Sequence, residues 1–428
     1  MMRCDVLVVG AGPAGMAAAA VAAETGRRVI LVDDNPASGG QIWRGYAESG
    51  GTNQPHSAEF AKRAQRLKPA GVELLSGTRV IDLPKQHVLR VENDSGSADV
   101  AFDRLILATG ARERFLPFPG WTLPGVMGAG GLQAMVKAGL PVAGKRVVLA
   151  GSGPLLIAVA AYLSRHGAKV MGIFEQSPFS RLVRFSAGLI FQPAKLMEGA
   201  SYRLHTLSSA YRTSSWVMHA GGNGRLQFVV IRTGGAIREV ACDYLGCGFH
   251  LIPNLELPRL LGCAIQGGYV RVDSTQQSSA SGIYCAGELT GIGGLEKALV
   301  EGEIAGLAAA GRPVAHLAQR RNRAIRFARN LDAAFALRAE LRTIPDAQTI
   351  VCRCEDVRLS MLQNMRNGRD AKLHTRCGMG ACQGRVCGPA TAFLFGWESE
   401  SVRPPLLPAD MRTLATPCEA SAPASAES

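Results

Sequence analysis

Uninterrupted apolar runs beside glycine turns are the clearest pattern in this chain. The run VLVV at residues 6–9 leads into Gly-Ala-Gly-Pro and an alanine-rich stretch, and the run VILV follows at residues 29–32. Short apolar runs without polar alternation are typical of parallel strands buried on both faces, and the alanine-rich stretch favours a helix. The pattern therefore predicts a strand, a glycine turn, a helix and a second parallel strand.

The first glycine turn has the spacing of a dinucleotide-binding fingerprint. Gly10 allows a tight turn, Gly12 lets the backbone approach a pyrophosphate, and Gly15 lets the helix pack closely on the strand. The N-terminus of the following helix would offer free N–H groups and its positive dipole to the phosphates. The residues predicted to bind the cofactor here are Gly10, Gly12, Pro13, Ala14 and Gly15.

An acidic residue after the second strand completes the fingerprint, and the whole pattern then recurs. Asp34 is the predicted acceptor for the ribose hydroxyls, with Asp33 as the less favoured alternative. In the repeat, KRVVLAGSGPLL to FEQS, the corresponding residues are Gly151, Gly153 and Glu175. The third glycine is replaced by a leucine at position 156. We therefore expect a second nucleotide-type domain whose site holds an adenine nucleotide, a nicotinamide nucleotide or nothing.

Three further glycine-bounded segments fit a flavoprotein into which a nucleotide domain is inserted. They are a strand ending in Ala-Thr-Gly, a strand followed by Gly-Glu and an Ala/Leu helix, and the loop ASGGQIWR. In their order along the chain, with the loop first, the segments resemble the flavin oxidoreductases of the glutathione and thioredoxin reductase type, where they surround FAD. That resemblance implies cofactor contacts from Thr109, Gly110, Gly287, Glu288, Gly40 and Gln41. In this group an Asp is usual where this chain has Glu288.

One departure from that group concerns its redox-active dithiol. Disulfide reductases carry two nearby cysteines beside the flavin, but this chain has none between Cys4 and Cys242. Electrons must therefore leave the flavin by another route.

Composition and charge exclude several other classes of protein. The chain is 47% hydrophobic and only 6% aromatic, which disfavours a stacking platform for nucleic acid. Two uncharged runs of 18 residues, 6–23 and 147–164, each contain Gly-x-Gly-Pro and are predicted to be a strand and a helix rather than membrane segments. We expect a soluble cytoplasmic protein.

Nearly half of the net charge of +13 lies in one segment. Residues 312–342 contain eight arginines against Asp332 and Glu340, at helical spacing with apolar residues. This pattern predicts a helix that is either solvated or docks on a partner. In the second case Arg320, Arg321 and Arg323 are the charges expected to steer that partner.

Six of the eleven cysteines lie in the last 86 residues, in VCRCEDV, CGMGACQGRVC and the tail. In a chain without a secretory signal, such a cluster favours a metal site or redox chemistry over structural disulfides. Four thiolates would hold a two-iron, two-sulfur cluster, although zinc fits the same donors. Glycines around these cysteines would leave backbone N–H groups free to bond the sulfides.

The CxC followed at a distance by GMGxCQGRxC resembles the small ferredoxin-like domain related to bacterioferritin-associated ferredoxin. Together with the flavoprotein pattern, it resembles the alpha subunits of bacterial dye-linked amino acid dehydrogenases, a family that includes D-hydroxyproline dehydrogenase, the opine oxidases and hydrogen cyanide synthase. By this resemblance Cys377 is not needed, and the cluster ligands are Cys352, Cys354, Cys382 and Cys387.

The same resemblance implies function and partners. A flavin-containing beta subunit would oxidise an amino acid derivative, such as D-hydroxyproline or an opine, and this chain would relay electrons through FAD and a 2Fe-2S cluster. A small ferredoxin-like gamma subunit is a further partner that the family allows. The rival hypotheses are a stand-alone NAD(P)H-dependent reductase and a redox-sensing iron–sulfur adaptor. The catalytic residues are not predicted.

The predicted architecture is therefore α/β. A doubly wound FAD domain is split by an inserted Rossmann-like nucleotide domain, and a ferredoxin-like domain follows. The expected boundaries are 1–140 and 268–311 for the FAD domain, 141–267 for the insertion, 312–344 for an arginine-rich helical linker, 345–400 for the cluster domain and 401–428 for a tail.

Overall fold

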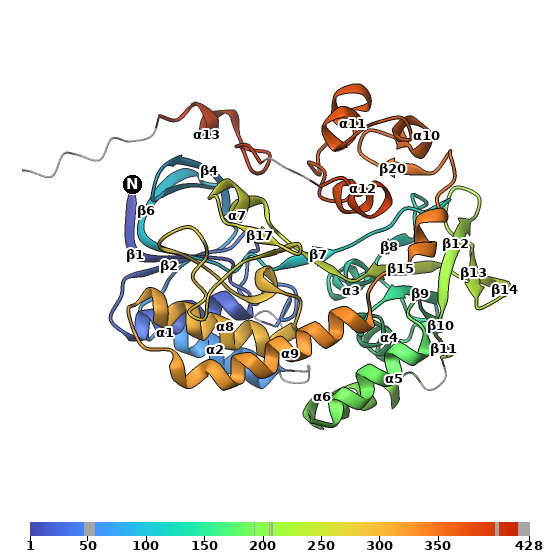
Figure 1. The fold of residues 1–428 in the computed structure, drawn as a ribbon, viewed down its shortest axis with the longest axis horizontal. Coiled ribbons are helices and arrows are strands. Elements are labelled where there is room, and N and C mark those ends of the chain that lie inside the picture. Colours follow the sequence, from blue (N-terminus) through green and yellow to red (C-terminus); the bar gives the residue numbers. More distant parts are fainter. Residues whose placement is uncertain (47–55, 192, 205, 207–208, 399–401, 418–428) are drawn as a thin grey trace, which may run out of the picture. The chain divides into compact units, whose positions relative to one another are not determined.

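The computed structural model describes residues 1–46, 56–191, 193–204, 206, 209–398 and 402–417. These residues form two compact units. The first contains residues 1–111, 253–328 and the described part of the C-terminal segment, and the second contains residues 112–252 and 329–398. Each unit has a largely parallel β-sheet at its centre (Figure 1).

The main sheet of the first unit has the strand order β3-β2-β1-β6-β5-β4, and β19 also pairs with β6. The pairs among β3, β2, β1, β6 and β19 are parallel, whereas β4, β5 and β6 pair antiparallel. Its strands are β1 (Met2–Val9), β2 (Val29–Val32), β3 (Glu73–Leu75), β4 (Arg79–Lys85), β5 (Val88–Asn93), β6 (Gly96–Leu107) and β19 (Ile283–Cys285), and a small separate sheet pairs β17 (Ile265–Gln266) with β18 (Tyr269–Val270).

The helices of the first unit follow the glycine turns and the strands. They are α1 (Pro13–Glu24), α2 (Ser57–Leu67), α7 (Glu256–Leu260), the short η2 (Gly287–Thr290), α8 (Gly294–Ala309), η3 (Ala315–Leu317) and α13 (Met411–Ala415). Figure 1 shows α1, α2 and α8 on one face of the sheet. The two apolar runs noted in the sequence each become a strand and a helix, β1 with α1 here and β9 with α4 in the second unit.

Alternate residues of each central strand face two different cores. Val6 and Val8 pack with α1 and α8, whereas Leu7 and Val9 pack with β4, β5 and the segment around α7. All four side chains are buried. Burial on both faces explains why the sequence of β1 is continuously apolar rather than alternating.

Helices α1 and α8 approach each other closely because glycines line their contact. A Cβ at Gly302 would lie 2.1 Å from the carbonyl oxygen of Ala14, and one at Gly306 would lie 2.3 Å from that of Ala18. Such distances leave no room for a side chain. The contact holds α8 against the helix that begins at the first glycine turn.

The C-terminal segment returns to the first unit. The Leu406 N–H donates to the Ile81 carbonyl at 2.8 Å, and the Asp410 N–H donates to the Glu92 carboxylate at 2.9 Å. The Arg90 guanidinium, which also pairs with Asp99 at 2.8 Å, donates to the carbonyl of Thr413. These contacts fasten residues 402–417 along β4 and β5.

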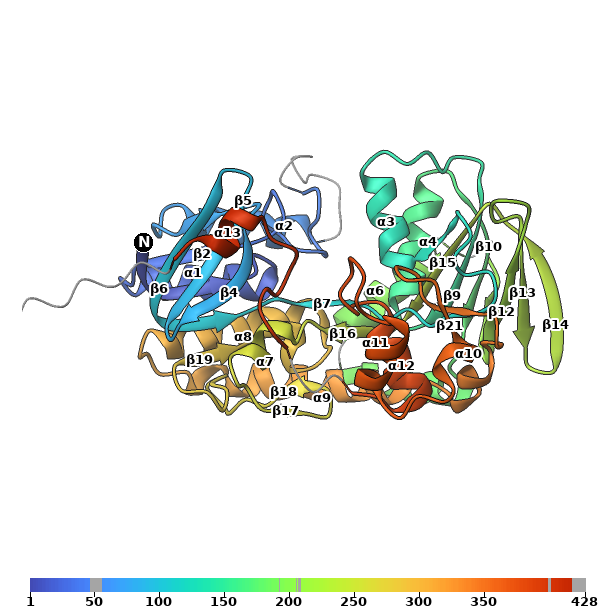
Figure 2. The same ribbon diagram turned by 90° about the horizontal axis from the view of Figure 1, so that it is seen from above.

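The main sheet of the second unit has the order β11-β10-β9-β15-β8, and β12, β13 and β14 form a separate antiparallel sheet (Figure 2). The strands are β8 (Val126–Gly128), β9 (Arg146–Ser152), β10 (Lys169–Glu175), β11 (Tyr211–Arg212), β12 (Ser215–Gly221), β13 (Phe228–Thr233), β14 (Ala236–Ala241) and β15 (Tyr244–Phe249). Its helices up to residue 204 are α3 (Ala129–Lys137), α4 (Leu155–Arg165), α5 (Phe179–Gly188), η1 (Leu189–Phe191) and α6 (Pro193–Leu204).

The same alternation organises this second sheet. Val147 and Leu149 of β9 pack on α3 and α4, whereas Val148 and Ala150 pack on the side of β12 and β13. Leu156, which replaces the third glycine, is buried in the α3–α4 core.

The remaining elements lie at the crossings between the units or after residue 338. Strands β7 (Ala111–Glu113) and β16 (Leu251–Pro253) and helix α9 (Ala318–Ala334) each span a boundary between the two units. The cysteine-rich part contains η4 (Ala339–Thr343), β20 (Ile350–Cys352), β21 (Val357–Arg358), α10 (Leu359–Leu362), α11 (Gly368–Thr375) and α12 (Cys387–Phe395). Within the residues that the structure describes, no helix is both long and apolar enough to cross a membrane.

Helix α9 carries most of the arginines that the sequence offered as a docking surface. Arg320 pairs with Glu303 at 2.9 Å, and Arg321 donates to the side chain of Gln276 at 2.8 Å and to the carbonyl of Asp273 at 3.0 Å. Two of the three arginines expected to steer a partner are therefore engaged within the first unit.

We expect Gly302→Ala to weaken the first unit, because the added Cβ would force α8 away from α1. Overpacking of this kind costs roughly 1–3 kcal/mol. Gly131→Ala is the matched control, since a Cβ there meets nothing within 4 Å and its φ is not positive. Urea unfolding followed by circular dichroism checks the difference. Equal unfolding midpoints for the two variants would contradict the close helix contact.

Candidate functional site

The first glycine turn is shaped by two close backbone approaches and one open position. Gly10 has φ +105°, and a Cβ there would lie 2.3 Å from the carbonyl oxygen of Ala108, while a Cβ at Gly15 would lie 1.7 Å from that of Gly10. By contrast, a Cβ at Gly12 would meet nothing closer than the Cα of Gly40, at 3.9 Å. The open space in front of Gly12, at the N-terminus of α1, fits the pyrophosphate of a dinucleotide.

Small residues at the start of α1 allow close packing as well as the approach of a pyrophosphate. Pro13 is the first residue of the helix, where its missing N–H costs no hydrogen bond. The Ala14 side chain is buried, and a Cβ at Gly287 would lie 3.0 Å from it. The turn after β19 is thereby held against the start of α1, which brings two of the predicted cofactor-binding segments together.

The acidic pair after β2 is arranged differently from our expectation. The Asp33 carboxylate accepts from the Ala11 N–H within the glycine turn, and also from the backbone and side-chain nitrogens of Asn35 at 2.8 Å. Asp33 is buried, whereas Asp34 is exposed and accepts from the Asn35 side chain at 3.0 Å. The geometry favours Asp33 as the acid beside the pyrophosphate turn, because its carboxylate bonds that turn directly.

The loop with two adjacent glycines lies over the same turn. The Gly39 N–H donates to the Ala11 carbonyl at 2.8 Å, and a Cβ at Gly40 would lie 3.0 Å from the Cα of Gly12. Both glycines have positive φ, +124° and +58°. Gln41 is exposed. Glycine is required here because the loop must pass close to the fingerprint.

Thr109 and Gly110 follow the end of β6 and are fixed by a residue that the sequence did not reveal. The Asn254 side chain donates to the Thr109 carbonyl at 2.7 Å, and its backbone N–H donates to the Gly110 carbonyl at 3.0 Å. In return, the Thr109 hydroxyl donates to the Asn254 carbonyl at 3.2 Å. A single asparagine after a short apolar run carries no distinctive sequence signal.

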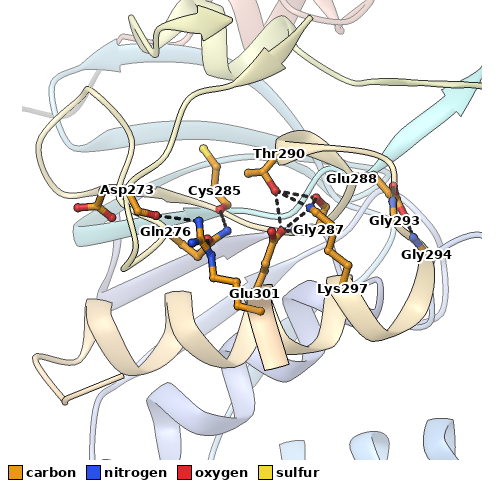
Figure 3. Close-up of polar contacts among 11 residues, drawn as sticks. Asp273, Gln276, Cys285, Gly287, Glu288, Thr290, Gly293, Gly294, Lys297 and Glu301 are labelled. Carbon is orange, nitrogen blue, oxygen red and sulfur yellow. Dashed lines mark hydrogen bonds and ion pairs between the residues drawn. The ribbon is translucent and has the colours of Figure 1, made fainter. Parts of the chain in front are cut away.

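The Glu288 side chain reaches from η2 to the N-terminus of the following helix, α8 (Figure 3). Its two carboxylate oxygens accept from the N–H groups of Gly293 and Gly294 at 3.0 and 2.9 Å. Burial raises the pKa of this carboxyl, and nearby Lys297 and the two N–H groups oppose that rise. Because the carboxylate caps α8, it stabilises the turn that the family resemblance assigns to the ribityl chain.

A buried ion pair lies beneath the same turn (Figure 3). The Lys297 ammonium donates to the Gly287 carbonyl at 2.8 Å, to the Thr290 hydroxyl at 2.7 Å and to the Glu301 carboxylate at 2.7 Å. Glu301 also accepts from the Gly287 N–H at 3.1 Å and from the Thr290 hydroxyl at 2.6 Å. Lys297 and Glu301 are 2% and 1% exposed. Sequence reasoning missed both, although a Lys and a Glu four residues apart in the same helix were the available signal.

The second glycine turn has the same construction but a different environment. Gly151 has φ +141°, and a Cβ there would lie 1.9 Å from the carbonyl oxygen of Gly248. Glu175 accepts from the Gly153 N–H at 2.8 Å and from the Ser177 N–H at 2.9 Å. Burial raises the pKa of the Glu175 carboxyl, which is completely inaccessible to water.

The cysteine-rich part brings five thiols into two groups. The sulfurs of Cys352, Cys377 and Cys387 lie within 4.8 Å of one another, and all three residues are buried. Cys354 and Cys382 lie close enough for each thiol to alter the pKa of the other. Cys377, which the family resemblance left out of the ligand set, therefore lies with two of the predicted ligands.

Backbone donors surround these sulfurs. Burial raises the pKa of the Cys352 thiol while the backbone N–H of Gly378 opposes that rise, and the backbone N–H groups of Val386, Gly384 and Arg385 act to lower the pKa of Cys382. Soft thiol donors with N–H groups directed at them fit an iron–sulfur cluster, and the thiols alone also fit zinc. The sequence indicated this role for the glycines through their spacing around the cysteines.

Comparisons with known proteins agree with this geometry. The family model of pyridine nucleotide-disulphide oxidoreductases matches residues 4–310. The hydrogen cyanide synthase subunit HcnB of Pseudomonas aeruginosa is 33% identical over 90% of this chain and 91% of its own length. An opine oxidase subunit of Rhizobium meliloti is 32% identical over 97% of this chain and 99% of its own length.

Solved structures show the same fold. The L-proline dehydrogenase of P. horikoshii matches with a TM-score of 0.69 at 18% identity, over 97% of this chain and 80% of that one. The thioredoxin reductase of T. acidophilum matches with a TM-score of 0.56 at 22% identity, over 73% and 99%. The chain therefore belongs to the pyridine nucleotide-disulphide oxidoreductase family of flavin-dependent enzymes, among the relatives of hydrogen cyanide synthase HcnB and of the corresponding opine oxidase subunits.

Proposed function

We propose that this chain is the electron-relaying subunit of a multi-subunit dehydrogenase that acts on an amino or imino acid. The observation that carries the proposal is that Cys352, Cys354, Cys382 and Cys387 gather, with Cys377, in the last part of a chain that has the flavoprotein fold over residues 4–310. Relatives at about a third identity are themselves named as subunits, of opine oxidase and of hydrogen cyanide synthase. D-hydroxyproline and the opines are the substrates that we propose.

The described cysteines of the first unit all lie in its core, which favours an electron route through another part of the chain. Cys4, Cys263 and Cys285 all lie in the core on the sheet face opposite α1 and α8. All three are buried. Without a thiol pair in the reductase motif, electrons need another acceptor, and we assign that role to the cysteine-rich part as a ferredoxin-like domain.

Different residues of this chain would hold FAD and the 2Fe-2S cluster. FAD would lie with its pyrophosphate at Gly12 and the start of α1, its ribose near Asp33, and its ribityl side at Gly287. A 2Fe-2S cluster would take Cys352, Cys354, Cys382 and Cys387. When bound, FAD supplies an acceptor for two electrons, and the cluster accepts them one at a time.

The chain's own residues position these groups. The glycine turn provides N–H donors and a helix dipole for the phosphates. The Lys297–Glu301 pair keeps the Gly287 turn in place from below, through three hydrogen bonds of the ammonium. The backbone N–H groups of Gly378 and Gly384 would stabilise negative charge on the sulfurs.

We expect the purified chain alone to be inactive toward amino and imino acids and to gain activity only with a flavin-containing partner. Dye reduction would be measured with D-hydroxyproline, octopine, nopaline and glycine, for the chain alone and co-expressed with a candidate beta subunit. Full-rate oxidation by the isolated chain would contradict the relay role. Rapid steady-state NADH oxidation by it would favour the reductase hypothesis.

Gly12→Val should abolish or strongly reduce FAD content, because a side chain there would fill the space in front of the first turn. Gly131→Val, at a position where a Cβ meets nothing within 4 Å, serves as the control and should retain flavin. Flavin absorbance per chain and circular dichroism give the readouts. A correctly folded Gly12→Val protein with full flavin would show that the pyrophosphate lies elsewhere.

Replacing Cys352, Cys354, Cys382 or Cys387 by Ser should remove or weaken the EPR signal of the reduced cluster and lower the iron and sulfide content. Cys377→Ser, which alters a thiol in the same buried group, should largely preserve both. The opposite pattern, with Cys377 essential and one of the four dispensable, would move Cys377 into the ligand set. Zinc in place of iron would refute the cluster.

A further inference from the structure

We infer that residues 332–338 close the second dinucleotide turn from within the chain, so that this domain takes no nicotinamide dinucleotide. In open parallel α/β sheets, ligands bind outside the carboxyl ends of the strands. Strands β9, β10 and β15 run parallel and end at Ser152, Glu175 and Phe249. What lies across these three ends decides what the domain can bind.

The last turn of α9 and the segment that follows it contact two of these strand ends directly. The Ser152 hydroxyl donates to the Phe335 carbonyl at 3.0 Å. The His250 Nε2 atom, one residue beyond β15, lies 2.9 Å from a carboxylate oxygen of Asp332. The chain therefore crosses the second glycine turn at the side chain of Ser152, its middle residue.

Gln176 ties the same segment to the end of β10. Its Nε2 donates to the Ser152 hydroxyl at 2.9 Å and to the Ala336 carbonyl at 3.3 Å, and its Oε1 accepts from the Arg338 N–H at 3.1 Å. This one amide bridges both strands and the crossing segment. Gln176 is 0% exposed.

Side chains of the second unit anchor the segment on its outer side. The Arg181 guanidinium of α5 donates to the Ala336 carbonyl at 3.1 Å. The rings of Phe185 and Phe335 meet edge to face with centroids 5.6 Å apart. The Arg338 guanidinium lies 5.1 Å from the centroid of a Trp216 ring.

The acid that would bind a ribose is consequently covered. The carboxylate of Glu175 accepts from the N–H groups of Ser177 and Gly153, as that of Asp33 does from Asn35 and Ala11 in the first turn, so the two turns differ in what covers the acid and not in these bonds. Glu175, Gln176 and Ser177 are all completely inaccessible to water. A ribose hydroxyl could reach Glu175 only after residues 335–338 had left.

This inference goes beyond the proposed function, because it concerns the ligand of the second domain and stands on contacts within the second unit alone. A nicotinamide nucleotide could then not deliver a hydride from the strand ends of this domain. The test is therefore separate from any dye-reduction assay.

The experiment titrates the flavin-loaded, full-length protein with NADH and with NADPH by calorimetry, and follows hydrogen exchange of residues 150–154, 175–178 and 332–338. We expect no saturable heat from either nucleotide, and slow exchange in all three segments that neither nucleotide changes. Saturable binding that protects residues 150–154, or that speeds exchange at 332–338, would overturn the inference.

A variant tests the proposed closure itself. Gln176→Ala removes the bridging amide and should speed exchange at 335–338 about tenfold, as expected for the loss of buried hydrogen bonds. Phe179→Ala, on α5 but 68% exposed, is the matched control and should leave exchange unchanged. Unchanged exchange in a folded Gln176→Ala protein would contradict the closure. Should that variant fail to fold, the titration of the unaltered protein decides.

Discussion

The flavin side of this fold depends on one ammonium group that lies out of contact with water. Burying a charge costs several kcal/mol unless partners compensate it. Lys297 is 2% exposed and uses three hydrogen bonds, to Gly287, Thr290 and Glu301. Because two of these partners belong to the turn after β19 and the third to α8, the turn and the helix form one rigid piece. The glycine contact between α8 and α1 then places that piece against the first fingerprint.

Much of the fold was predictable from local patterns, and the contacts between distant segments were not. Glycine spacing and apolar runs indicated both parallel sheets and both turns. They favoured Asp34 over Asp33, whereas Asp33 is the acid that bonds the turn, since adjacent acids differ only in which face of the strand end they occupy. Lys297 and Glu301 looked like ordinary helix residues, because burial depends on how α8 packs rather than on its own sequence.

The segment across the second glycine turn was the feature that the sequence predicted least, because backbone atoms make its contacts. The segment that crosses the second glycine turn binds through the carbonyls of Phe335 and Ala336 and the N–H of Arg338. Every residue carries such groups, so no pattern of residue types announces them. The arginine-rich stretch suggested a surface for another protein, yet Arg320 and Arg321 are used within the first unit. The cysteines differ, because their chemistry is visible in the sequence and only the position of Cys377 needed the structure.

The path of the chain through the two units has a consequence for its synthesis on the ribosome. The first unit needs β19 and α8, at residues 283–309, to complete its sheet and its helix contact, and residues 402–417 to cover β4 and β5. The main sheet of the second unit is complete once β15 has emerged at residue 249. The inserted sheet can therefore assemble before the sheet that precedes it, while β1, β2 and β6 wait as an unfinished apolar surface. The strands that are made first are thus among the last to gain all of their neighbours, and such unfinished apolar surfaces are prone to aggregation.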